Sequence, residues 1–92
     1  MSFVLRFSPD GMSAAKYQEC IDKLKAAGAG APKGRSYHVA YGNTDSIQVT
    51  DVWDSMEDFE AFGQTLIPIL HSLDVDPGQP EITEVENIII GK

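Results

Sequence analysis

The sequence predicts an α+β fold. Four segments of its 92 residues alternate apolar and polar side chains with the period of two that is typical of strands. Two other segments repeat apolar residues at the three- and four-residue spacing of amphipathic helices. The order along the chain is strand, helix, strand, strand, helix, strand. A chain of this length folds around one modest core, so we expect a single domain over residues 1–92.

The first strand and the first helix occupy residues 2–27. Phe3, Leu5 and Phe7 fall on one face of a strand over residues 2–8, and turn-forming residues follow it. A helix is predicted from Met12 to Ala27, because apolar residues then recur on one side at helical spacing. The loop after it, residues 28–34, is rich in glycine and proline and is expected at the surface.

A hairpin and a second helix form the next part of the chain. Residues 35–42 and 46–53 alternate as strands, and the residues between them have the length of a hairpin turn. Ser55 is a good N-cap for the helix that follows, since its side chain can accept a bond from a free N–H group. We expect Pro68 to kink or restart that helix, because proline cannot donate to the backbone ladder. The final strand is predicted over residues 81–90.

This order matches the split βαβ, ferredoxin-like plan, a four-stranded antiparallel sheet with both helices on one face. Two helices can cover only one face of such a sheet. The uncovered face should then be polar in a monomer, yet several strands carry apolar side chains on both faces, as in Val4 opposite Leu5 and in the run of residues 88–90. We therefore expect a homodimer in which two sheets pack face to face about a two-fold axis.

Charge and composition exclude several classes of function. The net charge is −7, and eleven of the acidic residues lie in residues 43–92, so nucleic acids and anionic membranes are poor partners. No apolar run approaches the roughly 20 residues of a membrane helix. The single cysteine, Cys20, excludes an internal disulfide and a multi-cysteine metal site. The first residues lack the features of a signal peptide, so we expect a cytoplasmic protein.

Three segments carry a family resemblance. Residues 36–41 (SYHVAY), 51–63 (DVWDSMEDFEAFG) and 66–70 (LIPIL) resemble the dimeric α+β barrel superfamily, most of all its small antibiotic-biosynthesis-monooxygenase-like proteins. The step from a Trp-Asp-Ser strand end into a Phe-containing helix is the most specific motif. The resemblance implies a dimeric α+β barrel and an oxygenase or isomerase that works without a bound cofactor on an aromatic or polyketide-like substrate. Haem-degrading members also have an asparagine in strand one, and this sequence has none there.

His38 is the strongest candidate for a catalytic residue. It lies in mid-strand between small neighbours, Ser36 and Ala40, and a histidine can take up a proton near neutral pH. We expect it to be the proton acceptor of a pocket between the helices and the sheet. The predicted ligand-binding walls of that pocket are Tyr17, Trp53, Phe59, Phe62 and His71.

Other interpretations of the same residues remain open at this point. His38 could be a structural histidine bonded to a neighbour, and the protein could be a non-catalytic ligand-binding module or a purely structural homodimer. The two histidines are far apart and no element has metal-ligand spacing, so no metal site is predicted. Arg6, on a central strand, is expected to pair with an acidic residue of the second half of the chain, such as Asp51, Glu84 or Glu86.

Overall fold

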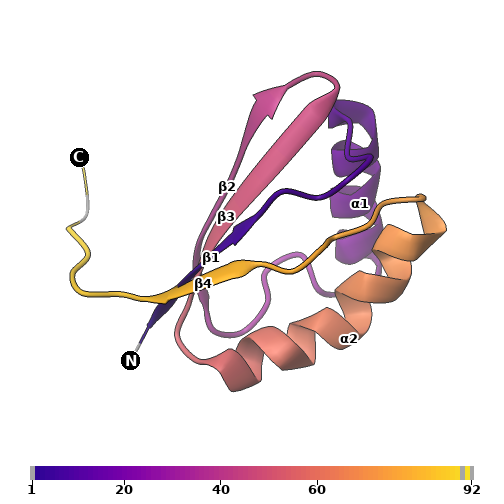
Figure 1. Ribbon diagram of the computed structural model, residues 1–92. Coiled ribbons are helices and arrows are strands. Elements are labelled where there is room, and N and C mark those ends of the chain that lie inside the picture. The colour runs from indigo at the N-terminus through magenta and orange to yellow at the C-terminus, as the bar shows by residue number, and fades with distance from the viewer. Residues whose placement is uncertain (1, 90, 92) are drawn as a thin grey trace.

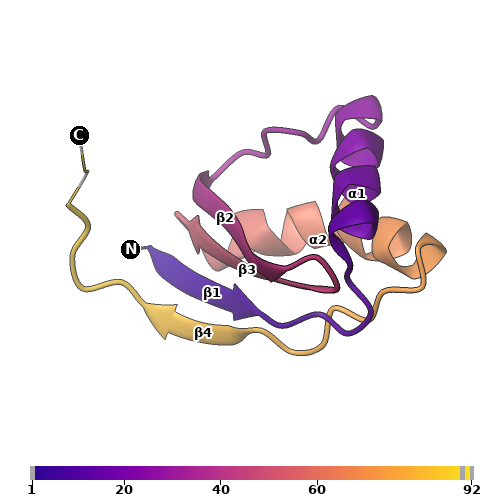
Figure 2. The same cartoon turned by 90° about the horizontal axis from the view of Figure 1, so that it is seen from above.

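The computed structural model describes residues 2–89 and 91, and it confirms the predicted order of elements. The elements are β1 (Phe3–Phe7), α1 (Ala14–Ala26), β2 (Arg35–Asn43), β3 (Ser46–Trp53), α2 (Met56–Ser72) and β4 (Glu81–Glu84). The four strands form one antiparallel sheet in the order β2-β3-β1-β4. Both helices lie against the same face of this sheet, which we call the helix face (Figures 1 and 2).

The strand register decides which side chains point toward the helices. Leu5 of β1 pairs with Asp51 of β3, and Asp51 pairs in turn with His38 of β2. Leu5 is fully buried and Asp51 is buried as well, so this row lies on the helix face. Because side chains alternate along a strand, the neighbouring row of Arg6, Thr50 and Val39 lies on the opposite face.

The core fills the space between the helix face and the helices. Trp53, at the end of β3, is fully buried, and its ring lies 5.6 Å from that of Phe59 and 5.4 Å from that of Phe62, centre to centre. Leu24 of α1 and Leu70 of α2 belong to the same cluster. Full burial of one large aliphatic or aromatic side chain contributes about 1.5–3 kcal/mol to folding.

The N-cap of α2 is the predicted Ser55, whereas α1 begins at Ala14, two residues after its predicted start at Met12. Ser13 and Ser55 are the N-caps, and each side-chain oxygen accepts a hydrogen bond from the backbone N–H three residues later, at 3.2 Å and 3.1 Å. The α2 helix continues through Pro68 without restarting, contrary to one form of the sequence prediction. The missing N–H costs one ladder bond, but Leu66 and Ile69 on either side pack against the core and hold the helix there.

The hairpin turn and the end of the last strand also differ from the sequence prediction. The β2–β3 hairpin turns over residues 44–45 alone, because the Asn43 side-chain oxygen accepts the N–H groups of Asp45 and Ser46, each at 3.0 Å. The predicted last strand, residues 81–90, ends as β4 at Glu84; Ile90 lies outside the described residues. Its partner β1 begins at Phe3, so the pairing with β1 ends at Glu84. One further hydrogen bond joins the Val85 N–H to the Ser2 carbonyl.

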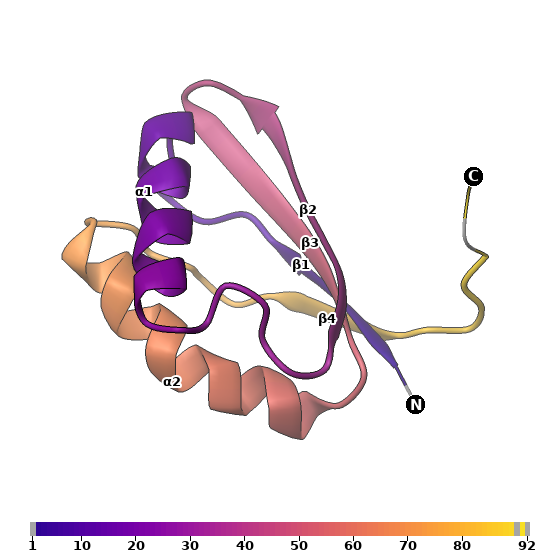
Figure 3. The same cartoon turned by 180° about the vertical axis from the view of Figure 1, so that it is seen from behind.

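The predicted loop between α1 and β2 is confirmed, and it crosses from the end of the helix to the sheet (Figure 3).

The far face of the sheet, opposite the helices, carries Tyr37, Val39 and Tyr41, which are 42%, 52% and 39% exposed. Arg6 also lies on this face and pairs at 3.7 Å with Glu81, an acidic residue of the second half of the chain as predicted, although Asp51, Glu84 and Glu86 were the examples named. The register explains this, because Arg6 and Glu81 are opposite each other while Asp51 points to the other face. Among the described residues, neither helix is long and apolar enough to cross a bilayer.

Candidate functional site

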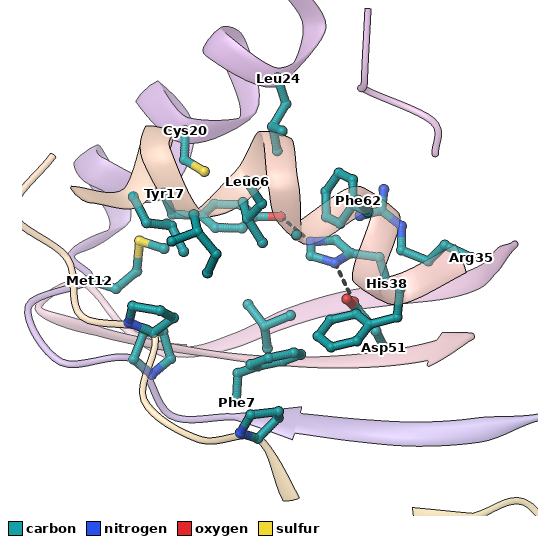
Figure 4. A pocket seen from close by; sticks show the side chains of 18 of the residues that line it. Phe7, Met12, Tyr17, Cys20, Leu24, Arg35, His38, Asp51, Phe62 and Leu66 are labelled. Atoms are coloured by element: carbon teal, nitrogen blue, oxygen red, sulfur yellow. Dashed lines mark hydrogen bonds and ion pairs between the residues drawn. The ribbon is translucent and has the colours of Figure 1, made fainter. Parts of the chain in front are cut away.

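A cavity of about 270 Å³ lies between the two helices and the helix face of the sheet. Its walls are mostly apolar side chains of β1, α1 and α2, joined by prolines and a glycine of the segment before β4. Tyr17, His38, Asp51 and Arg35 add the polar groups at one part of this wall (Figure 4). An apolar cavity with a few converging polar groups is the usual form of a small-molecule site.

Four side chains form a continuous hydrogen-bonded chain, which we call the relay. The Tyr17 hydroxyl lies 2.7 Å from Nε2 of His38, and Nδ1 of His38 lies 2.6 Å from Oδ1 of Asp51 (Figure 4). The indole N–H of Trp53 donates to Oδ2 of Asp51 at 3.3 Å. The four side chains come from three elements: α1 supplies Tyr17, β2 supplies His38, and β3 supplies Asp51 and Trp53.

The hydrogen-bond pattern fixes the tautomer of the neutral imidazole. An ionised carboxylate only accepts hydrogen bonds, so Asp51 takes one from Nδ1–H of His38 and one from Nε1–H of Trp53. Nε2 is then left with its lone pair and accepts the Tyr17 proton. The rings of Tyr17 and His38 are nearly parallel, with 6° between their planes. In this tautomer Nε2 is the basic nitrogen of the ring, and it faces the Tyr17 hydroxyl.

The pKa of the Tyr17 phenol is raised above its ordinary value of 10.0. Burial is the largest cause, since it disfavours the phenolate; the Arg35 charge opposes this effect, and the Asp51 charge adds to it. Tyr17 is therefore a neutral hydroxyl at physiological pH. It can pass a proton along the relay only if it receives another in return.

The structure brings together most of the residues that the sequence singled out. Tyr17, His38, Phe59 and Phe62 all line the cavity. Trp53 lies behind the wall rather than in it, fully buried and bonded to Asp51, so its position is that of a support for the carboxylate.

His71 lies apart from this group. It belongs to the last turn of α2, is exposed, and does not line the cavity. Because α2 continues through Pro68, the helical spacing puts His71 on the solvent side, while Leu70 is buried.

Three polar residues that line the cavity, Asp51, Arg35 and Glu60, were missed as site residues by sequence reasoning. Asp51 had a detectable signal, since it is the one charged residue on a strand face otherwise made of Ile47, Val49 and Trp53. A carboxylate in such a row is buried and needs partners. Arg35 had no such signal, because simple alternation along β2 puts it on the same face as Tyr37.

The described residues contain no group of three or more histidine, cysteine or acidic side chains that could hold a metal ion. Cys20 lines the cavity as a buried thiol, and burial raises its pKa, so it is present as the neutral, weakly nucleophilic form.

The sequence matches no protein-family model and no curated protein, whereas several solved structures share its fold. A candidate antibiotic biosynthesis monooxygenase from Chloroflexus aurantiacus superposes with a TM-score of 0.64 at 18% identity, covering 99% of this chain and 100% of that one. SnoaB, a cofactor-independent oxygenase from Streptomyces nogalater, gives a TM-score of 0.62 at 17% identity, with 96% and 94% covered.

A third structure, a candidate antibiotic biosynthesis monooxygenase from Deinococcus radiodurans, gives a TM-score of 0.57 at 16% identity and covers both chains in full. At such identities the similarity establishes the fold, and the chemistry has to come from the residues of the site. The chain therefore has the ferredoxin-like α+β fold of the antibiotic-biosynthesis-monooxygenase-like proteins, as its sequence predicts.

Proposed function

We propose that this protein is an enzyme that removes a proton from an aromatic or polyketide-like substrate held in the cavity, and that it acts as an oxygenase without a bound cofactor. The observation that carries the proposal is the relay, which ends in a largely apolar cavity. A general base needs both a proton acceptor with a fixed tautomer and a substrate space beside it, and both are present here.

The proton transfer uses three members of the relay. A substrate C–H or O–H group beside Tyr17 gives its proton to the tyrosine oxygen as the tyrosine gives its own proton to Nε2 of His38. Asp51, bonded to Nδ1, stabilises the imidazolium that forms. His38 is thus the net proton acceptor, and the apolar walls keep water from returning the proton early.

The substrate anion can then follow two courses. In the oxygenase course it reacts with dioxygen, and a ring CH₂ group plus O₂ become a carbonyl plus water. This course is favoured because SnoaB, which has the same fold, is described as a cofactor-independent oxygenase. In the alternative, isomerase course the anion takes the proton back at another carbon and no oxygen is consumed; this shares the same first step.

The test uses anthrone, whose ring methylene is acidic, and follows oxygen uptake and quinone formation above the buffer rate. We expect His38→Gln to lower the enzymatic rate by roughly 10²–10⁴-fold, the usual effect of losing a general base. His71→Gln is the matched control, since this histidine is exposed and outside the cavity, and its rate should be unchanged.

The isomerase course is separated by a second measurement, the exchange of the anthrone methylene protons in D₂O under nitrogen. This exchange reports the first step, which both courses share, so exchange that depends on His38 in a protein that takes up no oxygen from anthrone in air would indicate an isomerase. Binding without either reaction would contradict catalysis and leave a ligand-binding module.

The same proposal includes a homodimer assembled through the far face of the sheet. Tyr37, Val39 and Tyr41 are exposed there, and Ile88 and Ile89 after β4 are 42% and 86% exposed. Large apolar side chains grouped on a face that no helix covers favour an interface. A second copy of the chain, related by a two-fold axis, would cover this face.

Light scattering tests the assembly. We expect a mass of about 20 kDa, twice the 10.0 kDa chain, and a return to the single-chain mass in Val39→Glu, which puts a charge in the centre of the patch. Gln18→Glu adds the same charge on exposed α1 and should leave the mass unchanged. A single-chain mass for the unaltered protein at micromolar concentration would reject the dimer.

A further inference from the structure

Arg35 points into the cavity because of an irregularity in β2. It pairs with Trp53 of β3, while Tyr37 pairs with the preceding residue Val52, so Ser36 is an extra residue in the ladder. Such a bulge turns the side chain before it to the opposite face. Arg35 consequently lines the cavity together with His38, instead of sharing the far face with Tyr37.

The segment before Arg35 is held in place by backbone geometry. Gly34 has a φ of +88°, a conformation that favours glycine, and any side chain there would collide with the carboxylate of Asp58. The Gly34 carbonyl accepts the N–H of Asp54 at 2.7 Å, which ties this end of the loop to the end of β3. The loop between α1 and β2, seen in Figure 3, therefore ends at a fixed point, where Arg35 begins β2.

The guanidinium group has no carboxylate partner among the described residues. Its carbon lies 5.6 Å from the centre of the Phe62 ring, and its one hydrogen bond is a long one, 3.4 Å to the Gly30 carbonyl. The nearby carboxylate Asp51 is already occupied by His38 and Trp53. With a single hydrogen bond made, most of the five guanidinium donors stay available for a ligand.

Arg35 also lies between two cavities. A second cavity, of about 210 Å³, is lined by residues of the loop and of β2, and Arg35 and His38 line both spaces. Figure 4 shows Arg35 beside Phe62, at the His38 side of the main cavity. A ligand whose ring fills the main cavity can therefore direct a polar substituent toward the arginine and still have its reacting atom near the relay.

We propose that Arg35 binds an ionised oxygen group of the substrate, so that the natural ligand is a flat apolar ring system carrying one carboxylate, phenolate or enolate. This deepens the proposed function and rests on it. A guanidinium donates two parallel hydrogen bonds to a carboxylate, and one or two to a phenolate or enolate oxygen. Where that oxygen is conjugated to the carbon that loses its proton, the same contact also stabilises the anion formed by His38.

The test compares two probes of nearly the same shape, 2-naphthoate and 2-naphthamide, by isothermal titration calorimetry. The protein should bind the anion about tenfold more tightly than the neutral amide, the ratio expected for a hydrogen bond to a charged group. Arg35→Met should bring the ratio close to one through loss of naphthoate affinity, with amide binding retained. Arg35→Lys keeps the charge without the planar fork and should retain part of the preference.

Arg6→Met is the matched control. It removes an arginine from the far face, where Arg6 pairs with Glu81, and should leave the preference intact. Circular dichroism and the thermal midpoint of each variant show that it is folded. Equal affinity for the two probes in the unaltered protein, no binding of either, or an unchanged preference in folded Arg35→Met would each overturn the inference.

None of these measurements needs turnover. Anion preference without anthrone turnover would refute the proposed function alone, and His38-dependent turnover without anion preference would refute this inference alone.

Discussion

Two neighbouring rows of the sheet, one residue apart on every strand, differ in almost every physical property. The row of Leu5, Asp51 and His38 faces the helices, and its carboxylate is buried with two hydrogen-bond donors around it. The row of Arg6, Thr50 and Val39 faces away from the helices, and Val39 is half-exposed. The same backbone ladder thus supports a site on one face and a surface on the other.

The comparison shows that the surroundings, more than the residue types, determine what a polar pair can do. The bond from His38 to Asp51 measures 2.6 Å in a buried setting, while Arg6 and Glu81 lie 3.7 Å apart with side chains that are 62% and 72% exposed. Water screens the second pair and competes for its charges. The buried pair has a fixed geometry and so can define a tautomer.

The largest effect is expected from the apolar members of the two rows. Leu5→Ala removes a fully buried side chain and should lower the free energy of unfolding by about 3 kcal/mol, since it leaves a cavity in the core. Val39→Ala should cost less than about 0.5 kcal/mol in a single chain, because half of this side chain is already in water.

Urea denaturation at several protein concentrations measures both values. A cost for Val39→Ala that is larger where the protein is dimeric, and that shrinks as the protein is diluted through the range of dimer dissociation, would place that residue in the interface. Equal costs for both variants at high dilution would contradict the assignment of the two faces.

A smaller loss is expected from the polar member of the buried row. Asp51→Asn keeps the shape but places an amide NH₂ against one of the two donors, His38 or Trp53. An unsatisfied buried donor costs about 2 kcal/mol, so urea denaturation should show a loss of that size. Thr50→Ala, in the neighbouring row, loses only an exposed bond to Tyr41 of 3.0 Å and should change stability by less than about 0.5 kcal/mol.

The readout that distinguishes a positioning role from simple destabilisation is the proton NMR signal of the His38 Nδ1–H. We expect a strongly downfield resonance in the unaltered protein, and its loss in folded Asp51→Asn. A resonance that survives this substitution would contradict the relay.

The sequence predicted the helix face well, because Leu5, Val49 and Trp53 are placed by simple alternation. His38 was also found by alternation and by its small neighbours. Its partner Asp51 was not identified, since the contact depends on register between two strands and not on spacing within one. Arg35 was missed for a sharper reason: one extra residue at the bulge reverses the face that alternation assigns.

The next prediction concerns alkaline pH and Tyr17. Its pKa is raised in the folded protein, chiefly by burial, so the folded state holds this proton more tightly than the unfolded state. The stabilisation is therefore complete below pH 10 and is lost as pH rises through the folded-state pKa. Tyr17→Phe, which removes the hydroxyl bonded to His38, should cost about 1 kcal/mol at neutral pH.

That difference between the unaltered protein and Tyr17→Phe should shrink above pH 10, and urea denaturation at a series of pH values measures it. Tyr41→Phe, on the far face, is the control for loss of a hydroxyl. A difference that stays constant up to the alkaline unfolding limit would show that the Tyr17 phenol is not protected by burial.

The smallest effect is expected from the exposed ion pair, and it completes the comparison of the two rows. Glu81→Gln removes the charge that faces Arg6 at 3.7 Å, with both side chains largely in water. Such a pair contributes less than about 0.5 kcal/mol, and 1 M salt should remove what remains of the difference. Urea denaturation at low and high salt measures this against Asp51→Asn, whose cost should not depend on salt because its partners are buried. A salt-resistant cost above that limit for Glu81→Gln would mean that the Arg6–Glu81 pair is sheltered from water, as it would be beneath a second copy of the sheet.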